Sequence, residues 1–377
     1  MDKSKPSYDE KIEQHIIEAL APSVDVAFNE HMYTGPRMQR DTDIEMPETA
    51  GALPVMKTLY EAAGLPYEEG LTPELIETMR GSFMNHIDML EREYDSPREA
   101  ITTAALMNVS TEENLPHYHA DQLQTYKRHR SFAVMLNRWT VEESFHAPLL
   151  WTWGMLTNAI SDKVASAHKA ALLRGGISVD TTSVVAINAY TDPQEFATKQ
   201  AHQNLGRVLD PYSKRIMNAL AGQEYRHGKL FRKLGVALYQ LDDSRLTDYA
   251  LTIESHTHES FDMPARASYP DFGVAAKIIA THGLFTYQDI AKHQVERIKE
   301  VGIEQLRPVS DAAKLAQEKL IALTDPADRT HEIQKRIQRI IEQSYERAVA
   351  GRNKARIGSE KQPFMLGKTV GILRATK

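Results

Sequence analysis

The stretch VEESFHA (residues 141–147) contains a glutamate three residues before a histidine, and GQEYRHG (222–228) repeats this Glu-x-x-His spacing. Among the 15 histidines of the chain, only His146 and His227 are preceded in this way. Positions i and i+3 lie on one face of a helix, so each motif presents a carboxylate and an imidazole to the same point. Roughly one such match is expected by chance in a chain of this length, so a single motif would indicate little.

Two further glutamates complete a repeated pattern around these motifs. A metal site in a helix bundle takes a Glu-x-x-His from each of two helices and one glutamate from each of two others. Glu112 precedes Glu143 by 31 residues, and Glu195 precedes Glu224 by 29. Both intervals suit an antiparallel helix pair with a short connection. The spacing therefore predicts a two-metal centre with the ligands Glu112, Glu143, His146, Glu195, Glu224 and His227.

The chemistry of this ligand set restricts the metal. Four carboxylates and two imidazoles form a hard, oxygen-rich site that suits iron or manganese better than zinc or copper(I). The chain has no cysteine, which excludes disulfides, thiolate zinc sites, cysteine-ligated iron–sulfur clusters and a cysteine nucleophile. A redox reaction at this site would therefore take its electrons from a separate protein.

Helical periodicity dominates the chain, and β-branched alternation is scarce. Only residues 178–187 suggest a short extended piece. Amphipathic spacing predicts helices over about 1–20, 74–94, 111–128, 130–158, 162–175, 190–207, 211–240, 243–258 and 326–350, with more helix up to about 305. Residues 32–55 read as a loop. The sequence therefore predicts an all-α, bundle-like fold.

Composition excludes several classes of function. The net charge of −6 gives no sign of a nucleic-acid-binding surface. No apolar run approaches the roughly 18 residues that indicate a transmembrane helix. The first residues, MDKSKPSYDEKIEQ, lack the apolar region of a signal peptide and carry acids that transit peptides avoid. We therefore expect a cytoplasmic protein without a membrane span.

Four stretches around the predicted ligands resemble one known family. TEENLPHY (111–118) resembles TEEALPTY of the soluble acyl-carrier-protein desaturases, and RWTVEESFH (138–146) resembles their AWTAEENRH. QEFAT (194–198) resembles QERAT, and LAGQEYRHG (220–228) resembles AADEKRHE. The resemblance implies a ferritin-like helical bundle, with a four-helix di-iron core and extra helices.

The resemblance extends beyond these stretches, since residues 263–265 (MPA) and 280–291 resemble later helices of the family. It covers about 95–305, and it suggests three parts of the chain. We expect N-terminal helices and loops that pack on the core at 1–95, a ferritin-like di-iron core at 96–305, and a C-terminal helix with a basic tail at 306–377.

The family also implies a role for each ligand. Glu143 and Glu224 would bridge two iron ions. The other four ligands would complete the two irons in the pairs Glu112 with His146 and Glu195 with His227.

The implied activity is the desaturation of a fatty acyl chain bound to acyl carrier protein, with oxygen as oxidant and a ferredoxin-type electron donor. Thr198 matches the family hydroxyl beside the oxygen-binding face, and a proton relay is its implied role. The family also implies a homodimer. The basic residues within 226–233 read as a solvated helix face or as a surface for an acidic carrier.

Three departures from the family concern the surroundings of the metal site. Gln223 replaces an aspartate, so a neutral amide would face a ligand imidazole in place of a carboxylate. Ser144 and Phe145 replace Asn-Arg, and Pro148 closely follows His146. Proline inside a helix removes a backbone hydrogen bond, which predicts a kink just past the site. Gln223, Phe145 and Pro148 leave open a different substrate or reaction.

Two other classes of function therefore remain beside the desaturase. One is another di-iron oxygenase, such as a hydroxylase or a tailoring enzyme acting on a lipid or polyketide. The other is a ferritin-like metal-binding protein or a radical subunit, which would need a tyrosine beside the metals, such as Tyr118 or Tyr225. His117 and His119 read as surface or capping residues, not as additional ligands.

Overall fold

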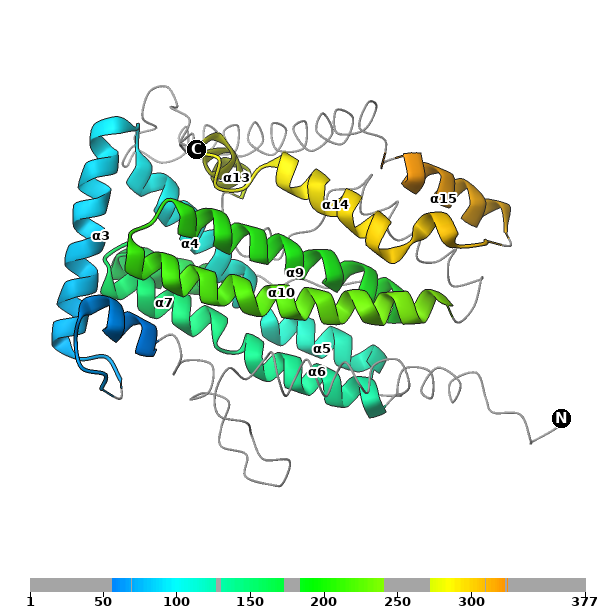
Figure 1. Cartoon of the computed structure of the whole chain (residues 1–377), viewed down its shortest axis with the longest axis horizontal. Coiled ribbons are helices and arrows are strands. Elements are labelled where there is room, and N and C mark those ends of the chain that lie inside the picture. Colours follow the sequence, from blue (N-terminus) through cyan, green and yellow to red (C-terminus); the bar gives the residue numbers. More distant parts are fainter. Residues whose placement is uncertain are drawn as a thin grey trace, which may run out of the picture.

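The computed structural model describes residues 56–68, 70–126, 130–172, 184–240, 272–308, 310–322 and 324. All the regular elements in these ranges are helices (Figure 1), which confirms the predicted all-α fold. Residues 56–63 are helical, and the elements that follow them are α3 (Pro73–Glu93), α4 (Pro97–Glu112), α5 (Leu115–Tyr126), α6 (Arg130–Glu143), α7 (His146–Leu156), α8 (Asp162–Leu172), α9 (Val184–Arg207), α10 (Pro211–Gln240), α13 (Phe272–Thr281), α14 (Tyr287–Val301), the short 3-10 helix η2 (Ile303–Gln305) and α15 (Asp311–Ala322). The helices predicted over 1–20, 243–258 and 326–350 and the loop over 32–55 lie outside the described residues.

Two helical hairpins form the core of the fold. Helices α9 and α10 lie side by side along most of their length and make the most extensive helix pair among the described elements (Figure 1). The second hairpin consists of two interrupted helices, because α4 packs on α7 and α5 packs on α6. Helix α3 crosses one end of the bundle, where it contacts α10, α4 and α7. The four-helix, ferritin-like core is thus α4–α5, α6–α7, α9 and α10.

Each helix of the second hairpin is interrupted, which the sequence prediction did not anticipate. Helix α4 ends at Glu112, so this glutamate closes a helix and does not begin the predicted 111–128 segment. The predicted 130–158 helix is divided into α6, ending at Glu143, and α7, beginning at His146. Both interruptions follow directly after a predicted ligand.

The second interruption also corrects the expectation for Pro148. The chain turns at residues 144–145, where the Phe145 N–H donates to the Glu142 carbonyl, so the break precedes His146. Pro148 is the third residue of α7. An N–H in the first turn of a helix has no partner within that helix, so proline is tolerated there. The predicted kink after the site is therefore absent, and the Leu149 N–H continues the ladder to the Phe145 carbonyl at 3.0 Å.

Helix α9 contains a proline whose effect is compensated by a buried arginine. Pro193 lies inside α9 and cannot donate to the carbonyl of Ala189. The fully buried Arg297 of α14 donates to this carbonyl from Nη2 at 2.6 Å. The start of α9 also corrects the expected extended piece at 178–187, because residues 184–187 are helical and 178–183 lie outside the described residues.

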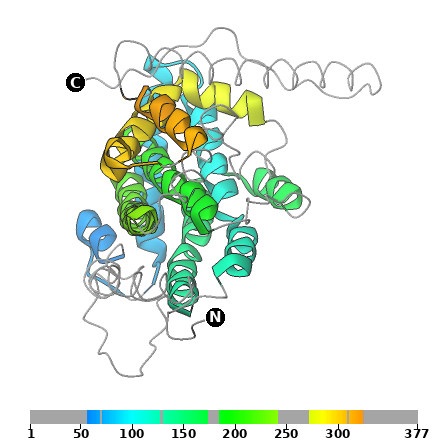
Figure 2. The ribbon, with the colours of Figure 1, turned by 90° about the vertical axis from the view of Figure 1, so that its right-hand side faces the viewer.

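The apolar core is split into two clusters, one toward each end of the four-helix core. One cluster joins α5 and α6 to the start of α9, the end of α10, α14 and α15, and it includes Trp139 and Phe231. The other joins α3, α4 and α7 to the end of α9 and the start of α10, and it includes Phe83 and Trp153. Figure 2 shows α14 and α15 on one side of the α9–α10 pair and α5 and α6 on the other. The polar side chains described below occupy the layer between the clusters.

No described helix has the length and apolar character needed to cross a membrane. The division of the chain into an N-terminal part, a core and a C-terminal part, with boundaries at 95/96 and 305/306, remains a prediction. Helix α3, before the first boundary, packs directly on core helices.

Candidate metal centre

The structure brings all six sequence-predicted residues together in the middle layer of the bundle. Each side chain is almost fully withdrawn from solvent, with at most 6% of any residue exposed. They come from five helices: Glu112 ends α4, Glu143 ends α6, His146 begins α7, Glu195 lies on α9, and Glu224 and His227 lie on α10. The interruptions in the second hairpin thus occur at ligand positions.

The six side chains form two overlapping groups of four. In the first group, Glu112 and His146 join Glu143 and Glu224; in the second, Glu195 and His227 join the same two glutamates. Within each group, one oxygen or nitrogen atom per residue lies within 4.8 Å of all the others. Glu143 and Glu224 are therefore placed to serve two metal ions at once.

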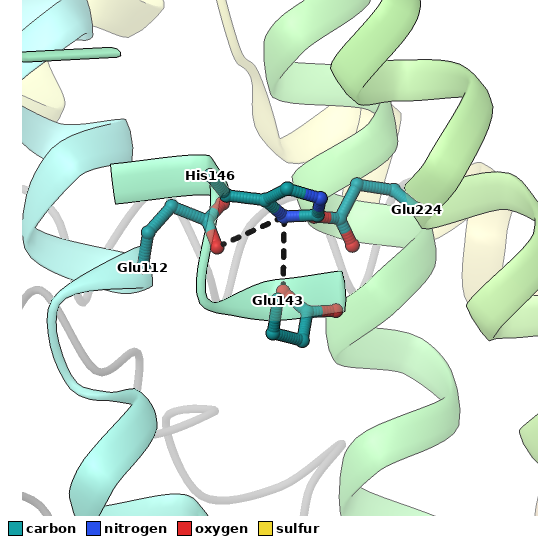
Figure 3. A group of neighbouring side chains, drawn as sticks. All are labelled: Glu112, Glu143, His146 and Glu224. Atoms are coloured by element: carbon teal, nitrogen blue, oxygen red, sulfur yellow. Dashed lines mark ion pairs between the residues drawn. The ribbon is translucent and has the colours of Figure 1, made fainter. Parts of the chain in front are cut away.

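The first group surrounds one imidazole nitrogen. His146 Nδ1 lies 2.8 Å from Glu224 Oε1, 2.9 Å from Glu143 Oε2 and 3.5 Å from Glu112 Oε2. Figure 3 shows the three carboxylates directed toward this ring. The three carboxylates belong to three different helices, α4, α6 and α10. Potential metal-ligand atoms from α4, α6, α7 and α10 thus meet at one point.

The second group repeats this arrangement around His227. Its Nδ1 lies 2.6 Å from Glu143 Oε1 and 3.5 Å from Glu195 Oε2. The His146 and His227 rings are stacked, with centroids 5.9 Å apart. The two halves of the site are therefore close to symmetric, in agreement with the matched spacing in the sequence.

Outer hydrogen bonds orient both imidazoles. His146 Nε2 lies 2.8 Å from the amide oxygen of Gln223, and His227 Nε2 lies 3.0 Å from a carboxylate oxygen of Glu142. An oxygen of either kind accepts, so each Nε2 carries the hydrogen and donates. When a ring is neutral, its Nδ1 therefore has no hydrogen and can offer its lone pair to a metal ion, as a metal ligand requires.

Unpaired atoms at the centre test whether a metal fits. Both histidine Nδ1 atoms and one oxygen each of Glu143, Glu195 and Glu224 make no hydrogen bond of acceptable geometry among the described residues. Acceptors that face one another in a buried site are costly unless a cation lies between them. The donor set therefore fits hard divalent metal ions, held by four carboxylates and two imidazoles.

Without metals, protons must offset the repulsion between these groups. Burial raises the pKa of Glu224 to about 7, and the neighbouring Glu143 carboxylate adds to this effect. Burial alone would lower the pKa of His146, but Glu143 and Glu224 outweigh it and hold that pKa well above its usual value. Metal binding would therefore displace protons from the site.

The sequence analysis missed two buried contacts to predicted ligands: the contact of Glu142 with His227, described above, and a contact of His202 with Glu112. His202 of α9 is fully buried, and its Nε2 lies 3.2 Å from Glu112 Oε1. The Asn108 amide donates to His202 Nδ1 at 3.1 Å, so His202 Nε2 carries the hydrogen and donates to the carboxylate. The spacing in the sequence could have identified His202, because it follows Glu195 by two helical turns and therefore lies on the same side of α9.

A narrow cavity of about 30 Å³ adjoins the carboxylates. Its lining combines four of the predicted ligands with residues of α4, α5, α6 and α9: Thr111, Glu112, Leu115, Tyr118, Gln122, Trp139, Glu143, Tyr190, Thr191, Gln194, Glu195, Thr198 and Glu224. Thr198 is thus close to the site, and its hydroxyl donates to the Gln194 carbonyl at 2.9 Å. Its role as a proton relay remains a prediction.

The other residues singled out in the sequence are spread around this site. Tyr118 is buried and lines the cavity, whereas Tyr225 is 44% exposed. His117 is exposed, and His119 Nδ1 lies 2.8 Å from the Thr140 hydroxyl. None of these four residues belongs to the two donor groups.

Comparison with known proteins identifies the family of the chain. Residues 67–350 match a family model described as fatty acid desaturase. The chain is 26% identical over 191 residues to a Mycobacterium tuberculosis protein with the name acyl-[acyl-carrier-protein] desaturase DesA1. That match covers 48% of this chain and 55% of the relative. The chain is also 25% identical over 233 residues to the chloroplastic stearoyl-[acyl-carrier-protein] 9-desaturase of Carthamus tinctorius, with 58% of this chain and 55% of the relative covered.

The aligned regions thus span about half the length of these relatives. The family match is wider, since it includes more than half of the present chain and all six clustered residues. Together with the all-α bundle, it shows that the chain belongs to the fatty acid desaturase family.

Proposed function

We propose that the six clustered residues hold two iron ions and that the protein uses them to desaturate a fatty acyl chain carried by acyl carrier protein. The observation that carries this proposal is the pair of four-donor groups that share Glu143 and Glu224. The family supports the choice of reaction, and the names of both relatives include an acyl-[acyl-carrier-protein] desaturase activity. Glu112 and Glu195 are the proposed terminal carboxylates.

Bound iron would supply oxygen activation and the removal of hydrogen from unactivated carbon, which protein side chains alone do not provide. The protein supplies position and exclusion of water. Gln223 and Glu142 hold the two rings in the ligand orientation, and the two apolar clusters enclose the centre on both sides. Thr198 is the proposed hydroxyl for moving a proton at the cavity.

Electrons and the acyl chain would reach the site from other proteins. The chain has no cysteine for an iron–sulfur cluster of its own, so we propose a ferredoxin-type donor. Within the basic stretch 226–233, Arg232 is buried and pairs with Asp192 at 2.8 Å. Arg232 is therefore unavailable to an acidic carrier, while Lys229 remains 39% exposed at its side chain. A homodimer, expected from the family resemblance, is testable by light scattering.

The proposal is tested by reconstitution with ferrous iron, reductant, ferredoxin, oxygen and a panel of acyl carrier proteins that carry chains of different length. Mass spectrometry should detect a product lighter by two hydrogens, which is lost in Glu143→Ala and retained in the control His117→Ala. A product heavier by one oxygen atom would instead assign hydroxylation. Turnover that survives Glu143→Ala would refute the proposed centre.

A further inference from the structure

The two donor groups contain the same kinds of ligand, but their surroundings differ. Each group has one glutamate and one histidine of its own, together with the shared residues Glu143 and Glu224. A difference in metal affinity between the groups therefore has its origin in the unshared ligands and in the side chains that contact them. Such outer contacts set how strongly a ligand donates electrons to a metal ion.

The two ligand histidines donate to acceptors of different charge. His227 Nε2 donates to a carboxylate oxygen of Glu142 at 3.0 Å, and Glu142 is only 4% exposed. His146 Nε2 donates to the neutral side-chain amide of Gln223 at 2.8 Å. A carboxylate attracts the imidazole hydrogen more strongly than an amide does, and this makes the opposite ring nitrogen a stronger metal ligand. His227 is therefore the stronger electron donor of the two histidines.

The two unshared glutamates differ in the same sense. The fully buried His202 donates from Nε2 to Glu112 Oε1 at 3.2 Å. A hydrogen bond to a carboxylate lowers its basicity and thus its strength as a metal ligand. Within the described part of the chain, no side chain outside the two donor groups forms a hydrogen bond with Glu195, and its Oε2 has no hydrogen-bond partner. Glu195 is therefore the stronger donor of the two unshared glutamates.

Both differences favour the same group. We propose that the two metal positions are unequal, and that the group around His227 binds the first metal ion about tenfold or more tightly than the group around His146 binds its own. This inference rests on the proposed function and goes beyond it, because it orders the filling of two positions with the same ligand types. A change in the outer partner of a ligand histidine alters metal affinity by about 10–100-fold, which is sufficient for such an order.

Two variants isolate the groups. Glu112→Ala removes a ligand of the His146 group alone and leaves the four donors around His227 complete. Glu195→Ala does the reverse. Each metal-free variant is titrated with ferrous iron under anaerobic conditions, and the dissociation constant of the tighter ion is measured. We expect Glu112→Ala to hold this ion about tenfold or more tightly than Glu195→Ala does.

A double variant tests whether the outer partners cause the difference. Glu142→Gln combined with Gln223→Glu moves the carboxylate from His227 to His146, and it preserves the length of both side chains and the composition of the protein. The ratio of the two dissociation constants, measured again in this background, should fall by about tenfold or more.

The order of filling is also measurable on the native protein, so the test does not depend on variant folding. One sample receives one equivalent of ferrous iron enriched in the Mössbauer-active isotope and then one equivalent of unenriched iron. A second sample receives the two in the opposite order. Unequal positions should give two different ferrous quadrupole doublets, because each sample labels a different position.

The outcomes separate this inference from the proposed function. If both samples give the same spectrum, if Glu195→Ala holds its ion as tightly as Glu112→Ala, or if the double variant leaves the ratio unchanged, the inference is wrong, and two bound irons would still support the proposed centre. If the native protein binds no iron, the proposed function itself fails, and the order of filling fails with it.

Discussion

Replacing Glu224 by glutamine should stabilise the metal-free protein, although it removes a predicted metal ligand. Burial, followed by the charges of Glu143 and Glu112, raises the pKa of Glu224 from 4.5 to about 7. One pKa unit corresponds to 1.36 kcal/mol, so the ionised carboxylate costs the folded state about 3 kcal/mol. Glutamine has nearly the same shape and no charge to bury.

The stability of the folded state depends on pH because Glu224 binds its proton more tightly in the folded than in the unfolded state. Below pH 4.5, Glu224 is protonated in both the folded and the unfolded state, so its contribution to stability is intact. Between pH 4.5 and about 7, the unfolded state releases this proton while the folded state retains it, so stability falls as the pH rises. Above about pH 7, the contribution of the Glu224 proton to stability is lost. Glu224→Gln has no such proton and should escape this loss.

Denaturant unfolding from pH 5 to 8.5, in the presence of a chelator, checks this prediction. At pH 8 the variant should be more stable than the native protein by up to about 3 kcal/mol, and the gap should close toward pH 5. Glu93→Gln, at an exposed position of α3, should leave the stability unchanged. With ferrous iron the order should reverse, since only the native site holds both metals. A variant that is less stable without metal at pH 8 would refute the reasoning.

Three further predictions concern the surroundings of the site. Gln223→Asp places a carboxylate beside the His146 imidazole and should tighten iron binding by the His146 group about tenfold. Glu142→Gln removes the carboxylate beside His227 and should weaken iron binding by the His227 group by a similar factor. Anaerobic iron titrations that show no change in affinity would contradict both expectations. Arg297→Met leaves a buried carbonyl and part of an ion pair unsatisfied, so denaturant unfolding should show a loss of about 2–4 kcal/mol, and a neutral result would contradict the compensating role. Gly228→Ala would place a Cβ 2.8 Å from the Phe196 ring, so unfolding should show a loss of about 1–3 kcal/mol, and unchanged stability would mean that the ring moves freely.

The sequence could predict the all-α fold and the residues that meet at the centre, because both depend on local spacing. Glu112 and Glu195 were recognisable through their matched distance to the two Glu-x-x-His motifs. The helix interruptions were missed because the apolar periodicity continues across residues 113–114 and 144–145. A two-residue turn changes the direction of the backbone without changing that pattern.

Contacts between distant segments could not be predicted in the same way. His202 reaches Glu112 only because α9 packs against α4, and Arg297 reaches the Ala189 carbonyl only because α14 packs on α9. Such features follow from the assembled bundle and have no signature in one sequence.

The number of metal ions bound per chain tests the central claim most directly. Anaerobic titration with ferrous iron, followed by dialysis and elemental analysis, should give two irons per chain in the native protein. His117→Ala, at an exposed position outside the donor groups, should also bind two. Glu143→Ala removes a carboxylate shared by both groups and should bind fewer. No retained iron in the native protein, or two irons in Glu143→Ala, would contradict the proposed centre.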